Sequence, residues 1–235
     1  MKILAIDSSS LVASVAVMDD DKLIGEYTID YKKTHSQTLM VMLENLSDLI
    51  ELDLCSIDAI AITSGPGSFT GLRIGGASAK GLAFALSKPI VAVPTLEALA
   101  YNLYGYADLI CPIMDARRNQ VYTGAYCYEN GNLISVIEQA AMSIEDLTDK
   151  LNEIGRKVIF LGDGVKVFRE YIDEHLKNEH GYAPVHMRAQ KAASVAARGM
   201  DKFLSGEIVD SAEFNLEYLR LSQAERERLA RGESI

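Results

Sequence analysis

The sequence predicts an α/β protein made of two similar halves, each with the order β-β-β-α-β-α. Short apolar runs alternate with segments whose apolar residues recur at helical spacing, which is typical of this class. The same order of elements occurs twice along the 235 residues, and each half begins with an apolar run that ends in an aspartate, Asp7 or Asp115. We therefore expect one domain over residues 1–106 and a second over residues 107–235.

In the first half, the runs KILAIDSS, VASVAVMD and KLIGEYTID predict three strands. A helix is expected from Ser36 to Leu52, because apolar residues there form one stripe at about 100° per residue. The stripe consists of Leu39, Met42, Leu43, Leu46, Leu49 and Ile50. The run IDAIAIT predicts a fourth strand, LRIGGASAKGLAFAL a helix of small residues from Leu72 to Leu86, and PIVAVPT a fifth strand.

In the second half, LICPIMDA, QVYTGAYCY and NLISVIEQ predict three strands, with a hairpin turn at Asn130 and Gly131. Ser143 is expected to cap a helix with two acidic residues in its first turn, which is favourable at a helix N-terminus. The strand KVIFLG and the helix VKVFREYIDEHL follow. A late helix near residues 191–204 is expected to pack back on the first domain, and the tail SQAERERLARGESI to form a solvated helix.

Composition and charge exclude several classes of function. The apolar runs are too short to span a bilayer and no leader segment is recognisable, so we expect a cytoplasmic protein with no membrane contact. The net charge of −10 opposes direct binding of a nucleic acid by this chain alone. Cys55, Cys111 and Cys127 lie in or beside apolar runs, so they are expected to be buried reduced thiols, with no disulfide framework or zinc site.

The duplication resembles the superfamily of actin, Hsp70-type chaperones and sugar kinases, whose members hold ATP between two ribonuclease-H-like domains. The resemblance implies that the turn after the first strand of each half could hold phosphate and its metal. The matching positions are Asp7, Ser8, Ser9 and Ser10 in the first half and Asp115, Ala116 and Arg117 in the second. Asp7 and Ser8 could instead only cap a turn, and both interpretations stay open.

The segment TSGPGSFTGLRIGG, residues 63–76, does not match the established phosphate-loop patterns. No lysine follows its glycines at the P-loop spacing, and the glycine spacing of the dinucleotide-binding fingerprint is exceeded by one residue. Gly65-Pro66-Gly67 therefore predicts a tight turn, after which Ser68 or Thr70 caps the next helix.

Glycines inside that helix each cost about 1 kcal/mol relative to alanine, so something must offset them. Gly75 with Ala79, and Ala77 with Gly81, are pairs of small residues that allow close approach of another element. That element is either the domain's own sheet or a helix of another chain, and both remain open.

The preceding helix favours contact with another chain. Met40 and Val41 lie off its apolar stripe, beside the polar residues Glu44, Asn45 and Asp48, so they are expected to face solvent as part of a binding patch. Packing beneath residues 27–33 is the alternative.

The segments ILAIDSSS, HSQTLM, DAIAITSGPGSFTGLRIGGASAKGLAFAL, PIVAVPTLEALA, MDARRNQVY and YLR resemble, in order and spacing, the TsaB family, formerly called YeaZ. The resemblance runs from residue 3 to about 222. It implies a bacterial factor needed for the threonylcarbamoyladenosine modification at position 37 of tRNA.

In that family TsaB is thought not to perform the transfer, which belongs to its related partner TsaD. TsaD-like proteins carry an H-x-x-x-H metal motif, whose positions correspond here to Thr95 and Leu99. Neither side chain offers an imidazole nitrogen, so no metal site is expected. His35 is expected to make a loop or capping contact, and the other three histidines to be solvated: His175, His180 and His186.

We therefore interpret the chain as a non-catalytic scaffold that binds and activates TsaD, with TsaE as a further partner and tRNA engaged only within the complex. The expected partner interface consists of Leu39, Met40, Leu43, Leu72, Gly75, Gly76 and Ala79. A homodimer through the same face is expected when TsaD is missing. No cofactor is expected in the isolated chain, although ATP or ADP could bind at a complex interface, and Asp7, Ser8 and Ser9 could be a vestigial nucleotide site. The alternative is an active phosphotransferase or ATPase that uses Asp7, Ser8 and Asp115.

Overall fold

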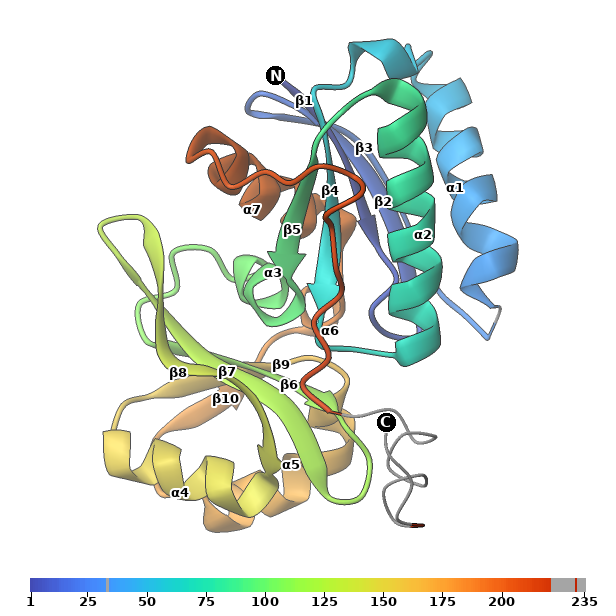
Figure 1. Cartoon of the computed structure of the whole chain (residues 1–235). Helices are drawn as coiled ribbons and strands as arrows, with labels where there is room; N and C mark the ends of the chain where they lie inside the picture. Colours follow the sequence, from blue (N-terminus) through green and yellow to red (C-terminus); the bar gives the residue numbers. More distant parts are fainter. Residues whose placement is uncertain (33, 221–230, 232–235) are drawn as a thin grey trace.

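The chain folds into two lobes, each built on a five-stranded mixed sheet (Figure 1). The computed structural model describes residues 1–32, 34–220 and 231. The first sheet has the order β3-β2-β1-β4-β5. Its strands are β1 (Lys2–Asp7), β2 (Val12–Asp19), β3 (Lys22–Asp30), β4 (Ala59–Gly65) and β5 (Ile90–Pro94). Strands β1 to β3 are antiparallel, whereas β1, β4 and β5 are parallel.

The second sheet repeats this arrangement with the order β10-β9-β6-β7-β8. Its strands are β6 (Leu109–Asp115), β7 (Gln120–Glu129), β8 (Asn132–Ser143), β9 (Val158–Leu161) and β10 (His180–Tyr182). Asn130 and Gly131 have the positive φ angles that a tight hairpin turn needs, 52° and 82°. The predicted repeat of three strands, a helix, a strand and a helix is confirmed in both lobes. The fifth strand of the second sheet, β10, was not predicted.

The helices cover the sheets on both faces. They are α1 (His35–Leu49), α2 (Phe69–Leu86), α3 (Thr95–Tyr101), α4 (Ile144–Ile154), α5 (Gly164–His175), α6 (Val185–Arg188) and α7 (Ala192–Leu204), with a short 3₁₀ helix η1 (Leu54–Ser56). Helices α1 and α2 lie side by side on one face of the first sheet, and α7 lies on its other face, in contact with β1, β2, β4 and β5 (Figure 1). The late helix of the chain therefore packs on the sheet built by its first 94 residues.

Alternate residues of β1 enter two different cores. Leu4 and Ile6 pack with α1 and α2, whereas Ile3 and Ala5 pack with α7. A strand with both faces covered is expected to be apolar throughout, which explains the unbroken run at the N-terminus.

Some boundaries and environments differ from those predicted. Helix α1 ends at Leu49 rather than Leu52, and α2 begins at Phe69, three residues before the predicted start, because Ser68 accepts a hydrogen bond from the Gly71 amide. Ser143 caps α4 as predicted, by accepting from the Asp146 amide at 3.0 Å. The helical prediction for residues 222–235 lies outside the described residues, apart from Arg231.

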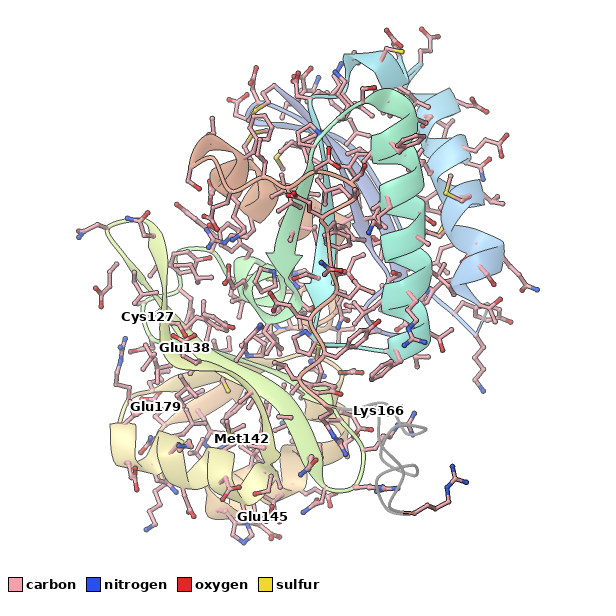
Figure 2. The ribbon with its side chains drawn as sticks, viewed as in Figure 1. Cys127, Glu138, Met142, Glu145, Lys166 and Glu179 are labelled. Atoms are coloured by element: carbon pink, nitrogen blue, oxygen red, sulfur yellow. The ribbon has the colours of Figure 1, made fainter. Side chains whose placement is uncertain are left out.

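The three cysteines are free thiols, of which Cys111 of β6 and Cys127 of β7 are buried. Figure 2 shows the position of Cys127 in the second lobe. Cys55 is exposed in η1, so the prediction that it is buried was wrong: the apolar neighbours Leu54 and Ile57 turn toward the core instead. Within the described residues, no helix has the length and apolarity that crossing a membrane requires.

Candidate functional site

Asp7 ends β1 and is almost completely buried, with 1% of its surface exposed. Its Oδ1 accepts hydrogen bonds from the amide and hydroxyl of Ser9, at 2.9 and 2.7 Å, and from the Thr63 hydroxyl at 3.3 Å. Within the described part of the chain, Oδ2 has no hydrogen-bond partner. Burial raises the pKa of Asp7, against the opposing effect of these hydrogen bonds. The structure therefore contains a buried carboxyl group, one of whose oxygens forms no hydrogen bond with the described residues.

Ser8 and Ser9 lie under the first turns of α2 rather than in an open loop. The Ser8 hydroxyl donates to the Gly71 carbonyl at 2.9 Å, and the Ser9 carbonyl accepts from the Ser68 amide at 2.7 Å. A Cβ on Gly71 would lie 2.1 Å from the Ser8 carbonyl oxygen, and a Cβ on Gly75 would lie 2.1 Å from Ser8 Oγ. Glycine is needed at both positions because the helix backbone touches the turn after β1.

This packing corrects the expectation that Gly75, Gly76 and Ala79 of α2, the glycine stripe, belong to an interface with another chain. Gly75 and Ala79 are buried against the chain's own sheet and turn. Gly76 lies beneath Leu216 and Phe214, whose side chains would be 3.4 to 3.5 Å from a Cβ there. Gly81 alone of these glycines has open space around it, with no atom within 4 Å of a Cβ.

Of the other four residues predicted to form the partner interface, three are buried and one is exposed. Leu39, Leu43 and Leu72 belong to the core and are at most 4% exposed. Met40 is exposed on α1, as predicted, together with Val41, so the alternative in which these two residues pack beneath residues 27–33 does not hold. Six of the seven predicted interface residues are therefore already buried within the chain. Leu49, which was predicted to belong to the apolar stripe of α1, is instead 81% exposed at the end of that helix.

The turn after β6 matches the turn after β1 in position but not in structure. Asp115 Oδ1 accepts from the Arg117 amide at 2.8 Å, and the Asp115 amide donates to Asp163 at 3.3 Å. Arg117, Arg118 and Asn119 all have positive φ angles, between 56° and 65°, and are exposed. The second half thus presents a strained basic turn where the first half has a buried serine turn.

A segment that the sequence pattern did not identify crosses this region. The C-terminal strap, residues 210–220, runs from the first lobe down to the second (Figure 1). Phe214 enters the core beside α2, and the Glu217 amide donates to the Ser64 carbonyl at 2.7 Å. The Tyr218 ring stacks on Phe69 at 4.3 Å between centroids.

The strap also contacts the second lobe. Gln139 of β8 donates to the Glu217 carboxylate at 3.0 Å, and Arg220 donates to the Ala116 carbonyl. These contacts place the strap across the glycine turn and tie the two lobes together. Its only sequence signal is the YLR motif at residues 218–220, because an extended segment has no amphipathic period.

Comparison with known proteins gives the family. The family model TsaD, described as tRNA N6-adenosine threonylcarbamoyltransferase, matches residues 22–227. The tRNA threonylcarbamoyladenosine biosynthesis protein TsaB of Bacillus subtilis (strain 168) is 36% identical over 225 residues, which cover 96% of each chain. This chain belongs to the TsaB family.

Solved structures agree with membership of the TsaB family. YeaZ from Pseudomonas aeruginosa matches with a TM-score of 0.79 and 27% identity, covering 93% of this chain and 99% of that one. The inorganic polyphosphate/ATP-glucomannokinase from Arthrobacter sp. strain KM matches with a TM-score of 0.53 over 87% of this chain and 99% of that one, and at 13% identity it shows the fold alone. The predicted α/β fold with a duplicated unit is confirmed, and it is the fold of a sugar kinase.

For this TsaB family member, the two positions that the sequence resemblance assigned to the TsaD metal motif lie in α3. Thr95 and Leu99 are 0% and 1% exposed, so both point into packed surroundings. His35 is buried at the start of α1, where its Nε2 contacts the Ser10 carbonyl at 2.7 Å. No group of three or more His, Cys, Asp or Glu side chains among the described residues is arranged to hold a metal ion.

Proposed function

We propose that this chain is a non-catalytic partner of a TsaD-type transferase, which it binds and activates in forming threonylcarbamoyladenosine at position 37 of tRNA. The observation that carries the proposal is its likeness to a TsaB protein over 96% of both chains, since that relative is named for threonylcarbamoyladenosine biosynthesis. TsaE is the further partner, and tRNA is engaged within the complex. We place the complex in the cytoplasm, where tRNA is modified.

The exposed apolar residues of the α1–α2 layer support a docking role. Met40 and Val41 are 46% and 51% exposed on α1, and Leu49 and Phe84 are about 80% exposed near the ends of α1 and α2. Methionine adapts its shape to a partner, and large apolar side chains exposed on a helical layer are typical of interaction sites. The docking patch of the proposal therefore comprises Met40, Val41, Leu49 and Phe84. In the absence of TsaD, the same patch would join two copies of this chain.

The residues at the TsaD metal positions support assigning the chemistry to the partner. Thr95 and Leu99 carry no imidazole, and Thr95 is enclosed at the start of α3. In this proposal the metal-dependent step occurs on TsaD, while the present chain holds TsaD in its active conformation. A nucleotide would bind where the two proteins meet.

Size-exclusion chromatography with light scattering tests the proposal directly. This chain and TsaD from the same organism would be run alone and mixed, with ATP and Mg²⁺ present. A new peak at the mass of a heterodimer is the expected result, followed by higher transfer activity of TsaD when the chain is added. Two unshifted peaks and unchanged activity would contradict the proposal.

A second candidate is an active nucleotide phosphotransferase, and the free Oδ2 of Asp7 is the observation in its favour. Calorimetry of the isolated chain with Mg-ATP separates the two candidates. Micromolar binding that is lost in Asp7→Asn would favour the phosphotransferase. If the heat measured on adding Mg-ATP is no larger than the heat of dilution, the isolated chain does not bind the nucleotide, and the result favours the scaffold function.

A further inference from the structure

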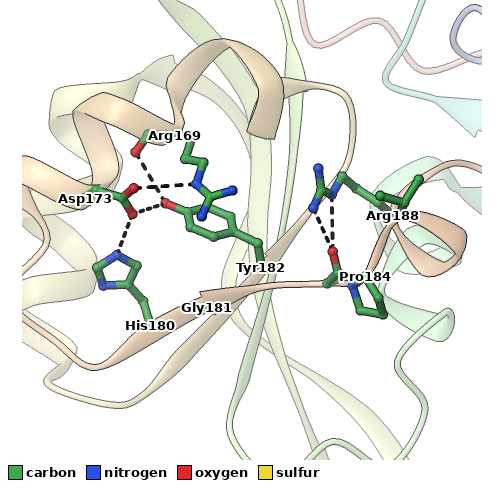
Figure 3. Close-up of a pocket in the computed structure, with 9 residues that line it drawn as sticks. Arg169, Asp173, His180, Gly181, Tyr182, Pro184 and Arg188 are labelled. Atoms are coloured by element: carbon green, nitrogen blue, oxygen red, sulfur yellow. Dashed lines mark hydrogen bonds and ion pairs between the residues drawn. The ribbon is translucent and has the colours of Figure 1, made fainter.

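A hollow of about 660 Å³ lies on the second lobe, beside the edge strand β10 (Figure 3). It is lined by Arg169 and Asp173 of α5, by β10, and by Pro184, Val185 and Arg188. Neither the family likeness nor the proposed docking patch on α1 and α2 accounts for it, because those helices belong to the first lobe.

Two fixed guanidinium groups lie on either side of Tyr182 in this hollow (Figure 3). Arg169 Nε is 3.5 Å from Asp173, and its guanidinium lies 4.5 Å from the centre of the Tyr182 ring. Arg188 donates from Nε and Nη2 to the Ala183 carbonyl, at 3.2 and 2.9 Å. These contacts leave further N–H groups of both arginines available for a ligand, because a guanidinium has five.

The hollow is positively charged in a chain whose net charge is −10. Asp173 accepts from the Tyr182 hydroxyl at 2.6 Å and lies 3.1 Å from His180 Nε2. The Tyr182 hydrogen bond lowers the pKa of Asp173, so this carboxylate stays ionised and orients its neighbours. Two arginines against one carboxylate leave a charge of +1 on the lining, which favours an anionic group in the hollow.

The floor of the hollow is an open sheet edge. β10 is the last strand of its sheet, and it bonds to β9 through the Glu179 carbonyl and the Ala183 amide. Backbone groups of alternate residues point to opposite sides of a strand, so those of His180 and Tyr182 face the open side. A Cβ on Gly181 would have no atom within 4 Å, and Val185, 81% exposed, supplies an apolar rim.

We propose that this hollow binds an extended acidic segment of a partner protein. The main chain of the segment adds to β10 as a further strand, and a glutamate or aspartate side chain enters the hollow that Arg169 and Arg188 line. A polypeptide uses both the backbone edge and the apolar rim, whereas a free anion uses neither. An RNA strand needs several phosphates neutralised at once, which a hollow of charge +1 does not provide.

An NMR titration of the ¹⁵N-labelled full chain tests this inference independently of TsaD. The probe is a blocked hexapeptide with one central glutamate among valines and threonines, and its analogue with glutamine replaces the carboxylate by an amide. We expect the peptide to shift the amide signals of His180, Gly181 and Tyr182, and the glutamine analogue to bind about tenfold more weakly.

Arg169→Gln and Arg188→Gln should each weaken binding of the glutamate peptide by about tenfold, whereas Lys150→Gln, on the exposed side of α4, should not. The glutamine analogue keeps the test valid if an arginine variant fails to fold. The absence of shifts at about 5 mM peptide, equal affinity for both peptides, or stronger shifts of the same amides by a hexauridylate would overturn the proposal.

Discussion

Ser8 occupies the space that a side chain on Gly75 would need, because a Cβ there would lie 2.1 Å from Ser8 Oγ. The same hydroxyl donates to the Gly71 carbonyl, one turn earlier in α2. Gly71 and Gly75 thus serve the contact between α2 and the turn after β1, and their cost in helix propensity is offset inside the chain.

Gly75→Ala should therefore destabilise the fold, although alanine is the better helix former. We expect the free energy of unfolding to fall by about 1–3 kcal/mol, the usual cost of overpacking, as measured by urea unfolding. Gly81→Ala is the matched control in the same helix, and with open space around Gly81 it should gain about 0.5–1 kcal/mol.

Ser8→Ala removes the hydroxyl oxygen that a Cβ at position 75 would clash with. This variant tests whether that clash is what makes Gly75→Ala destabilising. In that background, the cost of Gly75→Ala should be smaller by at least about 0.5 kcal/mol, the coupling expected of residues in contact. An equal cost in both backgrounds would show that the Ser8 hydroxyl is not what restricts position 75.

Asp7→Asn should stabilise the chain increasingly as the pH rises. Burial raises the pKa of Asp7 in the folded chain above 3.8, the ordinary value for an aspartate. The folded state then keeps a proton that the unfolded state has lost, so the contribution of Asp7 to stability is greatest below that value and decreases as the pH rises toward the folded pKa. Asparagine cannot ionise and avoids this loss.

The measurement is the difference in free energy of unfolding between Asp7→Asn and the unmodified chain from pH 4.5 to 7.5. It should increase with pH, by at most about 1.4 kcal/mol per pH unit. Asp21→Asn, which removes an exposed carboxylate, is the control. A slope for Asp7→Asn no steeper than that of the control would mean that Asp7 is not destabilised in its ionised form.

The duplication and most strands could be predicted because a strand covered on both faces, such as β1, has an unbroken apolar run in its sequence. The short edge strand β10, with the sequence HGY, has no such run and was not predicted. The partner of the glycine stripe could not be predicted, because sequence spacing shows that Gly75 allows close approach but not that Ser8 is what approaches. The strap escaped prediction for a related reason. Phe214 and Leu216 are ordinary apolar residues of an extended segment, and only the folded chain shows that they cover α2.

The stack of Phe69 on Tyr218 should hold the strap against α2. In a double-mutant cycle with Phe69→Leu and Tyr218→Leu, we expect a coupling of about 0.5–1.5 kcal/mol, the range for aromatic pairs in contact. Tyr31→Leu, at a tyrosine that is 67% exposed on the same lobe, should show no coupling with Phe69→Leu. Additive effects of Phe69→Leu and Tyr218→Leu would mean that the stack does not form in solution.

The three thiols should react at very different rates. Cys55 is exposed, whereas Cys111 is fully buried, and burial raises the pKa of its thiol to about 12. Because the thiolate is the reactive form, Ellman's reagent should modify one thiol quickly in the native chain and the other two only after unfolding. Cys55→Ser should remove the fast phase, and a fast phase that survives this change would contradict the assignment.

Met40→Asp and Val41→Asp should each weaken binding to TsaD while leaving the fold intact. Both side chains are about half exposed, so a carboxylate there stays hydrated in the free chain but would be buried in an apolar interface. We expect an affinity loss of at least about tenfold by calorimetry, with the free energy of unfolding changed by less than about 0.5 kcal/mol. Val167→Asp makes the same change on α5 of the other lobe, at a residue 57% exposed, and should leave TsaD binding unchanged. If all three variants bind TsaD equally well, the docking surface is not on α1, and if Val167→Asp alone weakens binding, it lies on the second lobe.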